Sequence, residues 1–355
     1  MKAFLVIPTL TVGGAERVVS IIANNWSKRN IDVHIVLLVG GKVNFIIKDN
    51  IVIHHLNFPI NRRGFYKLFE LMKLLFAFRK LSKLENPDFV LSFMNKYNVF
   101  VLFSLIGLNK RIIVSERDSP TEKLSYLVVF LRNIFYKYAD GVLCQTEDSR
   151  RFIIAQTGNK NVISIPNPVE FKDEIIGIPK EKIILNVGRL VEKKGQKFLL
   201  EIFSNLKCNN WNLVILGDGP LKESLINLAK ELNIYDRVMF IGSTSDVNTW
   251  YKKSSIFAFT SILEGFPNSL AEAMVNGLPC ISFNCKTGPS DIIIHGVNGV
   301  LIEEKNIKGF VDQLQMLIDN EELRNSYSTE AVKLINKLNS DFISNEYLKF
   351  CTNTI

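Results

Sequence analysis

The chain has 355 residues, of which 47% are hydrophobic and 22% charged, with 20 Gly and 11 Pro. This composition excludes a disordered chain, a collagen and a small disulfide scaffold, and the length favours two domains. No apolar run approaches the roughly 18–20 residues that cross a bilayer. The first run, MKAFLVIP, has no small-residue cleavage site after it. We therefore expect the protein to stay in the cytoplasm.

Charge is distributed unevenly along the chain. Residues 1–170 hold 23 Lys and Arg against 13 Asp and Glu, whereas residues 171–355 hold 20 against 22. This asymmetry predicts that the first half meets an anionic surface. The five cysteines form no CxxC pair and the four histidines show no metal-ligand spacing, so we predict reduced thiols and no metal site.

In chain order, short β-branched runs predict strands that alternate with helical patterns such as 197–206, 221–232 and 269–275. Continuous apolar strands between helices are typical of parallel sheets covered on both faces. The predicted strands are Ala3–Ile7, Asp32–Leu38, Asp88–Phe93, Arg111–Ser115, Gly141–Gln145, Ile183–Val187, Asn212–Leu216, Arg237–Ile241, Ile256–Thr260 and Pro279–Phe283.

The pattern occurs twice, on either side of a linker at Ile165–Val169 that contains two prolines. The fold class is therefore α/β, with two Rossmann-like domains facing a cleft. We place the N-terminal domain at residues 1–168 and the C-terminal domain at 169–340. Residues 341–355 are expected to form a helix that packs back on the N-terminal domain.

In open α/β sheets, ligands bind beyond the carboxyl ends of the strands, so the loops that follow strands deserve inspection. After the first strand, Gly13 and Gly14 open a helix. Paired glycines let backbone N–H groups approach a phosphate or a sugar, although two glycines at a helix start also suit a plain tight turn. The dinucleotide fingerprint G-x-G-x-x-G is absent.

Two loops of the second half carry basic residues or glycines. Arg189 and Lys194 follow a buried strand, where a guanidinium fork and an ammonium suit a diphosphate. The alternative is a solvated loop with ordinary basic residues. Gly217 and Gly219 enter a further helix and indicate either a nucleotide site or a helix start at Pro220.

Glu264 and Glu272 stand eight residues apart, the first after a strand and the second within a helix. Two carboxylates so placed are suited to binding sugar and ribose hydroxyls. Ser269 and Glu272 also match the capping box S-x-x-E, in which the carboxylate accepts from a backbone N–H. The local pattern leaves both interpretations open.

Together these motifs resemble the family 4 retaining glycosyltransferases of the GT-B fold, most strongly over residues 183–301. The resemblance is to the bacterial subgroup that builds O-antigen, capsule or lipid-linked oligosaccharides, including N-acetylgalactosaminyl transferases. The matching residues are Gly13–Arg17, Asn167-Pro168, Gly188-Arg189 with Lys194, Gly217–Pro220, Arg237-Val238-x-Phe240-x-Gly242, and Glu264 with Glu272 as E-x7-E.

The resemblance implies roles for these residues. Arg189 and Lys194 would hold the donor diphosphate, Glu264 would face the donor sugar, and Glu272 would bind the ribose. Residues implied to contact the donor are Gly13, Gly14, Gly217, Gly219, Ile241, Gly265, Phe266, Pro267, Asn268 and Glu272. The reaction would retain the anomeric configuration and use neither metal nor cofactor, only a donor nucleotide sugar, expected to be UDP-linked.

The chain departs from this family at one position. Many relatives carry a His after the strand that corresponds to Arg111–Ser115, whereas Arg117 stands there in this chain. We assign Arg117 to the site. It replaces the His, binds an anionic acceptor, or forms a surface ion pair with Asp118.

A helix predicted from Arg62 to Lys83 offers an explanation for the excess of positive charge in the first half of the chain. Lys73, Arg79, Lys80 and Lys83 fall on one face with Phe69 and Phe76, while Leu71, Leu75 and Phe78 are expected to pack on the sheet. Aromatic residues among cations suit a lipid headgroup interface, and Leu124–Lys137 extends it. The alternative is an ordinary amphipathic helix with a solvated basic side.

The sequence thus predicts a peripheral enzyme on the inner face of the cell membrane. It would move GalNAc, GlcNAc, Gal or Glc from a UDP-sugar to a polyprenyl-diphosphate-linked glycan, and nucleic acid is not an expected partner. A sugar-nucleotide 2-epimerase of similar fold and a catalytically silent relative are the alternatives.

Overall fold

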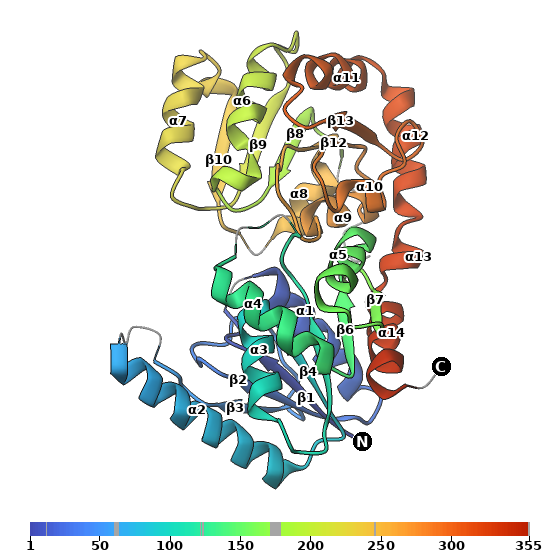
Figure 1. Cartoon of the computed structure of the whole chain (residues 1–355). Helices are drawn as coiled ribbons and strands as arrows, with labels where there is room; N and C mark the ends of the chain where they lie inside the picture. Colours follow the sequence, from blue (N-terminus) through green and yellow to red (C-terminus); the bar gives the residue numbers. More distant parts are fainter. Residues whose placement is uncertain are drawn as a thin grey trace. The chain divides into compact units, whose positions relative to one another are not determined.

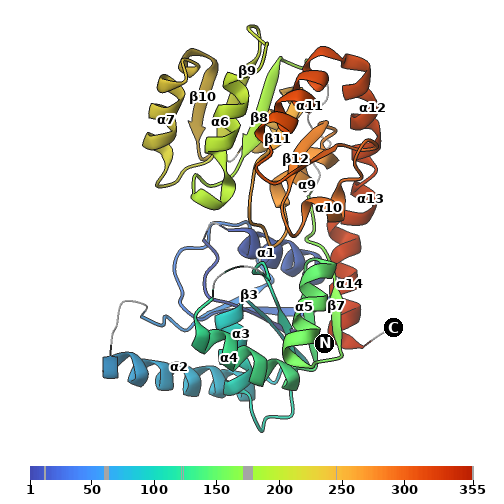
Figure 2. The same cartoon turned by 45° about the horizontal axis from the view of Figure 1, so that its top comes forward.

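The computed structural model describes residues 1–11, 13–59, 64–120, 122, 124–170, 179–244 and 246–353. It divides into an N-terminal unit, Met1–Pro168 with Ser340–Ile355, and a C-terminal unit, Val169–Asn339. Figures 1 and 2 show that each unit is a sheet with helices on both faces. Within the described part of the chain, no helix combines the length and apolarity needed to cross a bilayer.

The N-terminal unit is built on a seven-stranded parallel sheet in the order β3-β2-β1-β4-β5-β6-β7. Its strands are β1 (Lys2–Ile7), β2 (Asp32–Leu37), β3 (Val52–His55), β4 (Phe89–Phe93), β5 (Arg111–Ser115), β6 (Gly141–Cys144) and β7 (Val162–Ser164). Its helices are α1 (Gly14–Ser27), α2 (Gly64–Glu85), α3 (Asn95–Ser104), α4 (Tyr126–Phe135), α5 (Glu147–Thr157) and α14 (Ser340–Thr352), with a 3-10 turn at Tyr136–Tyr138.

Alternation along β1 shows how this sheet is covered. Leu5 and Ile7 point to the face occupied by α1 and by α14, which brings Tyr347 back from the far end of the chain. Phe4 and Val6 point to the opposite face, which is covered by α2 and α3. Because both faces are buried, the strand is apolar from Ala3 to Ile7, as expected for a parallel sheet.

The C-terminal unit contains a six-stranded sheet in the order β10-β9-β8-β11-β12-β13. Its strands are β8 (Ile183–Val187), β9 (Asn212–Leu216), β10 (Val238–Gly242), β11 (Ile256–Phe259), β12 (Cys280–Asn284) and β13 (Val300–Glu303). Its helices are α6 (Gln196–Ser204), α7 (Lys222–Glu231), α8 (Val247–Lys253), α9 (Asn268–Val275), α10 (Pro289–Ile292), α11 (Ile307–Asp319), α12 (Glu321–Val332) and α13 (Ile335–Leu338), with 3-10 turns at Glu192–Lys194 and Tyr235–Arg237.

The two sheets share one topology. In each, the first strand lies in the middle, and the chain moves outward first to one side and then to the other. The direction changes between β1 and β4 in the N-terminal unit and between β8 and β11 in the C-terminal unit. The loops beyond the carboxyl ends of such neighbours are where α/β sheets bind ligands.

The ten predicted strands are present with ends shifted by at most one residue, but three further strands escaped prediction. They are β3, β7 and β13, which lie toward or at the edges of their sheets and are three or four residues long. His54 and His55 are the last two residues of β3. This strand pairs with β2 through backbone hydrogen bonds.

Helix α2 packs on the sheet with a face that only partly matches the predicted one: Phe78 is buried as predicted and Leu75 is half-buried. Leu74 and Phe78 are buried, whereas Leu71 is 39% exposed. The prediction for Leu71 was wrong because α2 is apolar around most of its circumference, so sequence periodicity does not select one face. Arg62 and Arg63, with which the predicted helix began, lie outside the described residues.

Candidate functional site

An ion pair stands at the switch point of the C-terminal sheet. Lys194 Nζ donates to Glu264 Oε1 at 2.6 Å. Lys194 ends the 3-10 turn that follows β8, and Glu264 lies in the loop that follows β11. The Lys194 side chain is 21% exposed and that of Glu264 is 8% exposed. A cation and a carboxylate predicted separately from the sequence therefore face each other with little access to solvent.

Close backbone packing fixes this pair. Gly195 adopts φ +64°, and a Cβ at this position would overlap the carbonyl oxygen of Thr260. The amide of Ile262 donates to the carbonyl of Lys193 at 2.9 Å. The loops after β8 and β11 are thus joined directly, and only glycine combines the left-handed conformation with the close approach.

The glycine turn after β9 packs against the same loop. Gly217 has φ +134°, and a Cβ there would overlap the carbonyl oxygen of Gly188. The amide of Leu190 donates to the carbonyl of Asp218 at 3.0 Å. A Cβ on Gly219 would overlap the carbonyl of Leu190. These two predicted donor-binding glycines therefore have a demonstrable structural role, which is to let two post-strand loops interlock.

Glu272 is held by a hydrogen bond that the sequence did not indicate. Its Oε2 accepts from the hydroxyl of the buried Tyr251 at 3.1 Å. The capping-box interpretation is not realised, since α9 begins after Pro267 without a side-chain cap. The carboxylate of Glu272 is instead oriented by a phenol of α8.

The remaining predicted residues of this unit differ in their exposure to solvent. Arg189 is exposed directly after β8, and Ile241 is 42% exposed on β10. Phe266 is 5% exposed and belongs to the core of the unit, so its ring serves the fold. A Cβ at Gly288 would overlap the ring of Pro267, and Asn268 begins α9. Gly265 lies in the turn between them and Glu264.

Gly13, Gly14 and Arg117 belong to the N-terminal unit. Gly13 precedes α1 and Gly14 is its first residue, directly beyond the carboxyl end of β1. The carboxylate of Glu16 lies close to Gly13, where a Cβ would overlap it. Gly13 itself is extended, and the absence of a side chain there leaves room for Glu16 at the start of α1.

The Arg117 guanidinium is engaged within the N-terminal unit. Its Nη1 donates to Asn167 Oδ1, and its Nη2 donates to the Tyr347 hydroxyl at 3.1 Å. The guanidinium carbon lies 4.9 Å from the centroid of the Phe93 ring. Arg117 thus connects the loop after β5 with the interdomain linker and with α14, an arrangement that a sequence motif does not reveal.

Glu116, the neighbour of Arg117, is a buried carboxylate that sequence reasoning missed. Its Oε1 accepts from Asn95 Nδ2 at 2.8 Å, and Tyr136 OH donates to its Oε2 at 3.3 Å. Burial, with a smaller contribution from the nearby Asp118 carboxylate, raises its pKa to about 7. The signal available in the sequence was a charged residue immediately after a continuous apolar strand.

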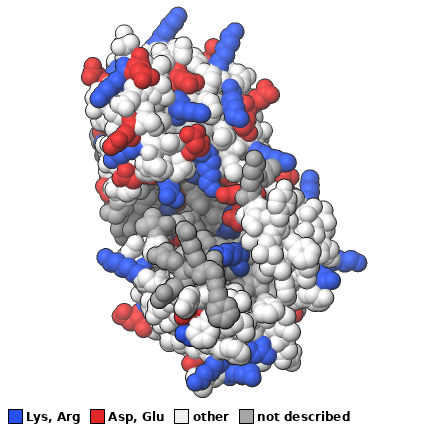
Figure 3. All heavy atoms as spheres, turned by 60° about the vertical axis from the view of Figure 1, so that its left-hand side comes forward, with Lys and Arg blue, Asp and Glu red and all other residues white. Residues whose placement is uncertain are grey.

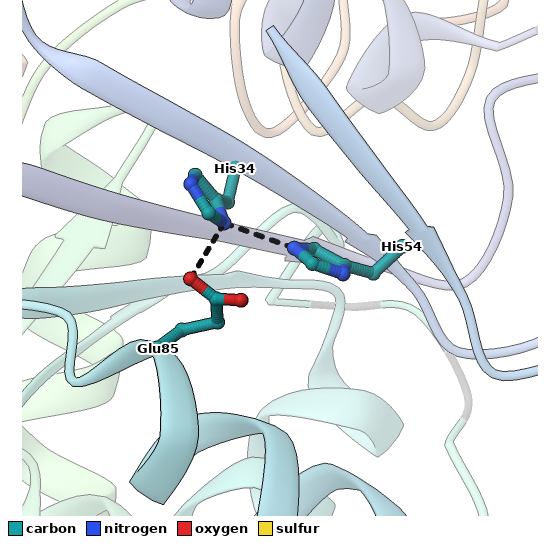
Figure 4. Close-up of side chains that lie close together, drawn as sticks. All are labelled: His34, His54 and Glu85. Atoms are coloured by element: carbon teal, nitrogen blue, oxygen red, sulfur yellow. Dashed lines mark hydrogen bonds and ion pairs between the residues drawn. The ribbon is translucent and has the colours of Figure 1, made fainter.

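Two histidines twenty residues apart also come together, although their sequence spacing gave no hint of it. His34 Nδ1 lies 2.9 Å from His54 Nε2 and 3.8 Å from Glu85 Oε2 (Figure 4). We call these three residues the histidine cluster. Its members come from β2, β3 and α2, so only the sheet topology places them in contact.

Comparisons with known proteins agree with this architecture. Residues 12–172 match the family described as Glycosyltransferase Family 4, and residues 168–334 match Glycosyl transferases group 1. An uncharacterized glycosyltransferase of Haemophilus influenzae is 34% identical over 90% of this chain and 91% of its own. The Campylobacter jejuni enzyme GalNAc-alpha-(1->4)-GalNAc-alpha-(1->3)-diNAcBac-PP-undecaprenol alpha-1,4-N-acetyl-D-galactosaminyltransferase is 27% identical over 98% of both chains.

Solved structures show the same fold. The lipopolysaccharide outer core galactosyltransferase WaaB has a TM-score of 0.80, with 24% identity over all of both chains. The Anabaena protein Alr3699/HepE, in complex with UDP, has a TM-score of 0.84, with 16% identity over 99% of this chain and 100% of its own.

Fold, loops and relatives define a two-domain sugar-transferring enzyme. The chain belongs to glycosyltransferase family 4 and has the GT-B fold. The family and fold predicted from the sequence motifs are confirmed.

Proposed function

We propose that this glycosyltransferase moves a sugar from a UDP-sugar to a polyprenyl-diphosphate-linked glycan, with retention of configuration, on the inner face of the cell membrane. The observation that carries the donor half of this proposal is the Lys194–Glu264 pair at the switch point of the C-terminal sheet. It provides a cation for a diphosphate and an acceptor for sugar hydroxyls in one place.

Lys194 and Arg189 act on the diphosphate. Arg189 is exposed in the same loop after β8 that leads to Lys194, so both cations come after the carboxyl end of this strand. Negative charge on the leaving UDP grows as the glycosidic bond to it breaks. Fixed cations therefore stabilise the transition state more than the bound donor, which is the condition for faster chemistry. The same charges remove the need for a metal ion in this step.

The two glutamates fix the two ends of the donor. Glu264, already tied to Lys194, accepts from hydroxyls of the sugar, while Glu272 accepts from the ribose. Tyr251 donates to one oxygen of Glu272 and thereby fixes the direction of that carboxylate. The departing diphosphate takes the proton of the acceptor hydroxyl on the face that it leaves, which accounts for retention.

Arg117 contributes by position. Because its guanidinium donates to Asn167 and Tyr347, we propose that it holds the loop after β5 in place and does not itself contact the donor sugar. Where many relatives carry a His, this chain thus carries an arginine that supports a loop of the N-terminal unit, the unit to which we assign the acceptor.

The acceptor assignment rests on relatives and on a surface. The Campylobacter jejuni relative is named for a glycan linked to undecaprenol through a diphosphate. In the N-terminal unit, α3 packs against both α2 and α4. These three helices expose large apolar side chains, namely Tyr66, Leu68, Phe69, Met72, Phe76, Phe103, Tyr126, Leu127 and Phe130, each at least 41% exposed.

We call these nine residues the apolar surface. A broad area without charged side chains is visible in the lower half of Figure 3. Large apolar side chains exposed on neighbouring helices commonly mark an interaction site. Exposed Lys73, Lys80 and Lys83 lie on α2 beside it. A lipid surface with anionic headgroups accommodates both kinds of residue, so we propose that this face docks on the membrane that carries the acceptor.

Nucleotide release from a panel of donors tests the proposal. Purified protein is incubated with UDP-GalNAc, UDP-GlcNAc, UDP-Gal, UDP-Glc or GDP-Man, with and without polyprenyl-diphosphate-linked glycans, and products are read by mass. We expect UDP release that depends on the acceptor, with a mass gain of one sugar. Conversion of a donor to its 2-epimer without acceptor would replace the proposal with an isomerase. If no donor is turned over, calorimetry of UDP binding distinguishes a missing acceptor from a silent site.

A further inference from the structure

The histidine cluster lies on the face of the N-terminal sheet that α2 covers. His34 is buried on β2, His54 lies on the neighbouring β3, and Glu85 is the last residue of α2. One ligand atom from each lies within 4.8 Å of the other two. Figure 4 shows the three side chains converging from three elements. Imidazole nitrogen and carboxylate oxygen are the donor atoms of many zinc sites.

A fourth side chain orients His34 for such a role. The other ring nitrogen of His34, Nε2, lies 3.1 Å from Asp32 Oδ1. An ionised carboxylate only accepts hydrogen bonds, so the proton of a neutral His34 ring resides on Nε2. The lone pair on Nδ1 then points into the cluster. A carboxylate behind a histidine in this way is the arrangement that commonly supports metal-bound imidazole.

The charges of the other two members suit a cation. The hydrogen bond from Lys2 lowers the pKa of Glu85, which keeps its carboxylate ionised. Burial lowers the pKa of His54, which keeps its imidazole neutral. A metal ion binds these two forms and competes with protons for both groups.

We propose that His34 Nδ1, His54 Nε2 and the Glu85 carboxylate bind one divalent transition-metal ion of the zinc class. Ligand atoms about 2.0–2.1 Å from a tetrahedral ion lie about 3.3 Å apart. The observed separations from His34 Nδ1, 2.9 Å to His54 and 3.8 Å to Glu85, lie on either side of that value. Small side-chain rotations therefore complete the site, and water takes the fourth position.

Lys2 must share Glu85 with the ion. Its Nζ donates to Glu85 Oε2 at 2.7 Å and lies 3.5 Å from Asp32 Oδ2. A carboxylate has acceptor positions for both a metal and an ammonium. Asp32 offers Lys2 a second partner if the two compete for one oxygen.

The role of this ion is structural. The cluster lies near the amino ends of the strands, where Lys2 and Asp32 begin β1 and β2. The predicted donor-binding residue Gly13 instead follows the carboxyl end of β1. The ion would link two neighbouring strands to the end of α2 and so fix the helix that carries much of the apolar surface. This inference does not depend on the proposed transferase reaction.

Zinc binding to tag-free, EDTA-treated full-length protein tests the proposal. Calorimetric titration with zinc chloride is expected to give one ion per chain, and the ion is expected to raise the melting temperature. His54→Gln should weaken binding at least 100-fold, because it removes one of three ligands. Asp32→Asn should weaken it about 10–100-fold by releasing His34. Asp32 is half exposed, so its replacement is compatible with folding.

His55→Gln is the matched control, since His55 neighbours His54 but is exposed. It should bind zinc like the unmodified chain. Cobalt substitution should give a tetrahedral spectrum without a thiolate band, because all five cysteines are buried outside the cluster. The proposal is overturned if the unmodified chain binds zinc no more tightly than millimolar. Equal affinity in the His54→Gln or Asp32→Asn protein would overturn it as well.

Discussion

Lys194 and Glu264 form an ion pair across the loops that follow β8 and β11, the two strands on either side of the switch point. Each is the other's counter-charge, and the donor diphosphate would bring Lys194 a second anion. Because the pair is largely shielded from solvent, replacing either residue leaves the other without its counter-charge. A substitution of Lys194 or of Glu264 therefore affects both the diphosphate contact and the sugar contact proposed for this site. This coupling makes the two residues a sensitive test of the proposed site.

Lys194→Ala and Glu264→Gln are expected to abolish transfer while the fold persists. Loss of a single preorganised electrostatic contact commonly lowers kcat by about 10²–10³-fold. Turnover is measured with the best donor found in the panel, and folding is checked by circular dichroism. Lys193→Ala is the matched control, since its side chain is exposed one residue away. Normal turnover in either site variant would disprove the assignment.

Gly195→Ala should destabilise the C-terminal unit and impair donor binding. The new methyl group meets the Thr260 carbonyl in a left-handed backbone conformation, which forces the loops after β8 and β11 apart. Gly158→Ala is an informative comparison, because Gly158 has φ +70° but open space around it. Its cost should be limited to the backbone term of about 1–2 kcal/mol. Equal melting temperatures for the two variants would contradict the packing explanation.

Arg117→Lys should lower stability by about 1–3 kcal/mol, because lysine cannot reach Asn167 and Tyr347 with two fixed donors. Tyr347→Phe removes one of these bonds and retains the ring, so its effect should be smaller. Urea denaturation measures both. An Arg117→Lys protein with unchanged stability and strongly reduced turnover would instead place the guanidinium on a substrate.

Glu116 is expected to make stability depend on pH. Its folded pKa, about 7, lies above the ordinary glutamate pKa of 4.5, so the folded state binds more protons between these values. Stability from this group is therefore greatest below pH 4.5 and falls as pH rises to 7. Glu116→Gln should be more stable than the unmodified chain at pH 8. Denaturation midpoints of both proteins are measured at pH 5 and at pH 8. If the midpoint changes with pH by the same amount in both proteins, Glu116 is not the origin of the pH dependence.

Membrane binding should depend on the lysines of α2. Changing Lys73, Lys80 and Lys83 to Glu is expected to weaken sedimentation with anionic vesicles by at least about 100-fold, at about 1 kcal/mol for each lost cation. Arg79 is best left intact, because its Nη1 donates to the carbonyls of Ser104 and Ile106 at the end of α3.

The charge-matched control changes three exposed lysines of the C-terminal unit, Lys230, Lys308 and Lys337, to Glu. This control should sediment like the unmodified chain. A separate variant with Phe76, Tyr126 and Phe130 changed to Ser tests the apolar contribution, since these side chains are at least 61% exposed. Unchanged sedimentation of both surface variants would remove the membrane from the proposal.

The strands were predictable because nearly all of those at the centres of the sheets are buried on both faces and hence continuously apolar. The short strands β3, β7 and β13 were not, since three or four residues carry little periodic signal. Apolar residues around most of α2 likewise hid which side packs, and Leu71 was assigned to the wrong face.

The site residues also divide into features that local sequence patterns predict and features that they do not. Glycines and charged residues directly after strands could be found one loop at a time, and Lys194 and Glu264 were singled out in this way. Their pairing, the bond from Tyr251 to Glu272, and the contacts of Arg117 join segments distant in sequence. Such partners follow from the order of strands in a sheet, which local patterns do not encode.

Helix α14 completes the N-terminal unit with the last described segment of the chain. The carbonyl of Ser344 accepts from Trp26 Nε1 at 2.8 Å, and Tyr347 packs in the core beside β4. During synthesis, the ribosome makes the whole C-terminal unit between Pro168 and Ser340. Until α14 emerges, the part of the sheet face and of α1 that this helix covers therefore stays exposed. That interval exposes it to chaperones and proteases, and a nascent chain stalled before Ser340 would be a sensitive substrate for both.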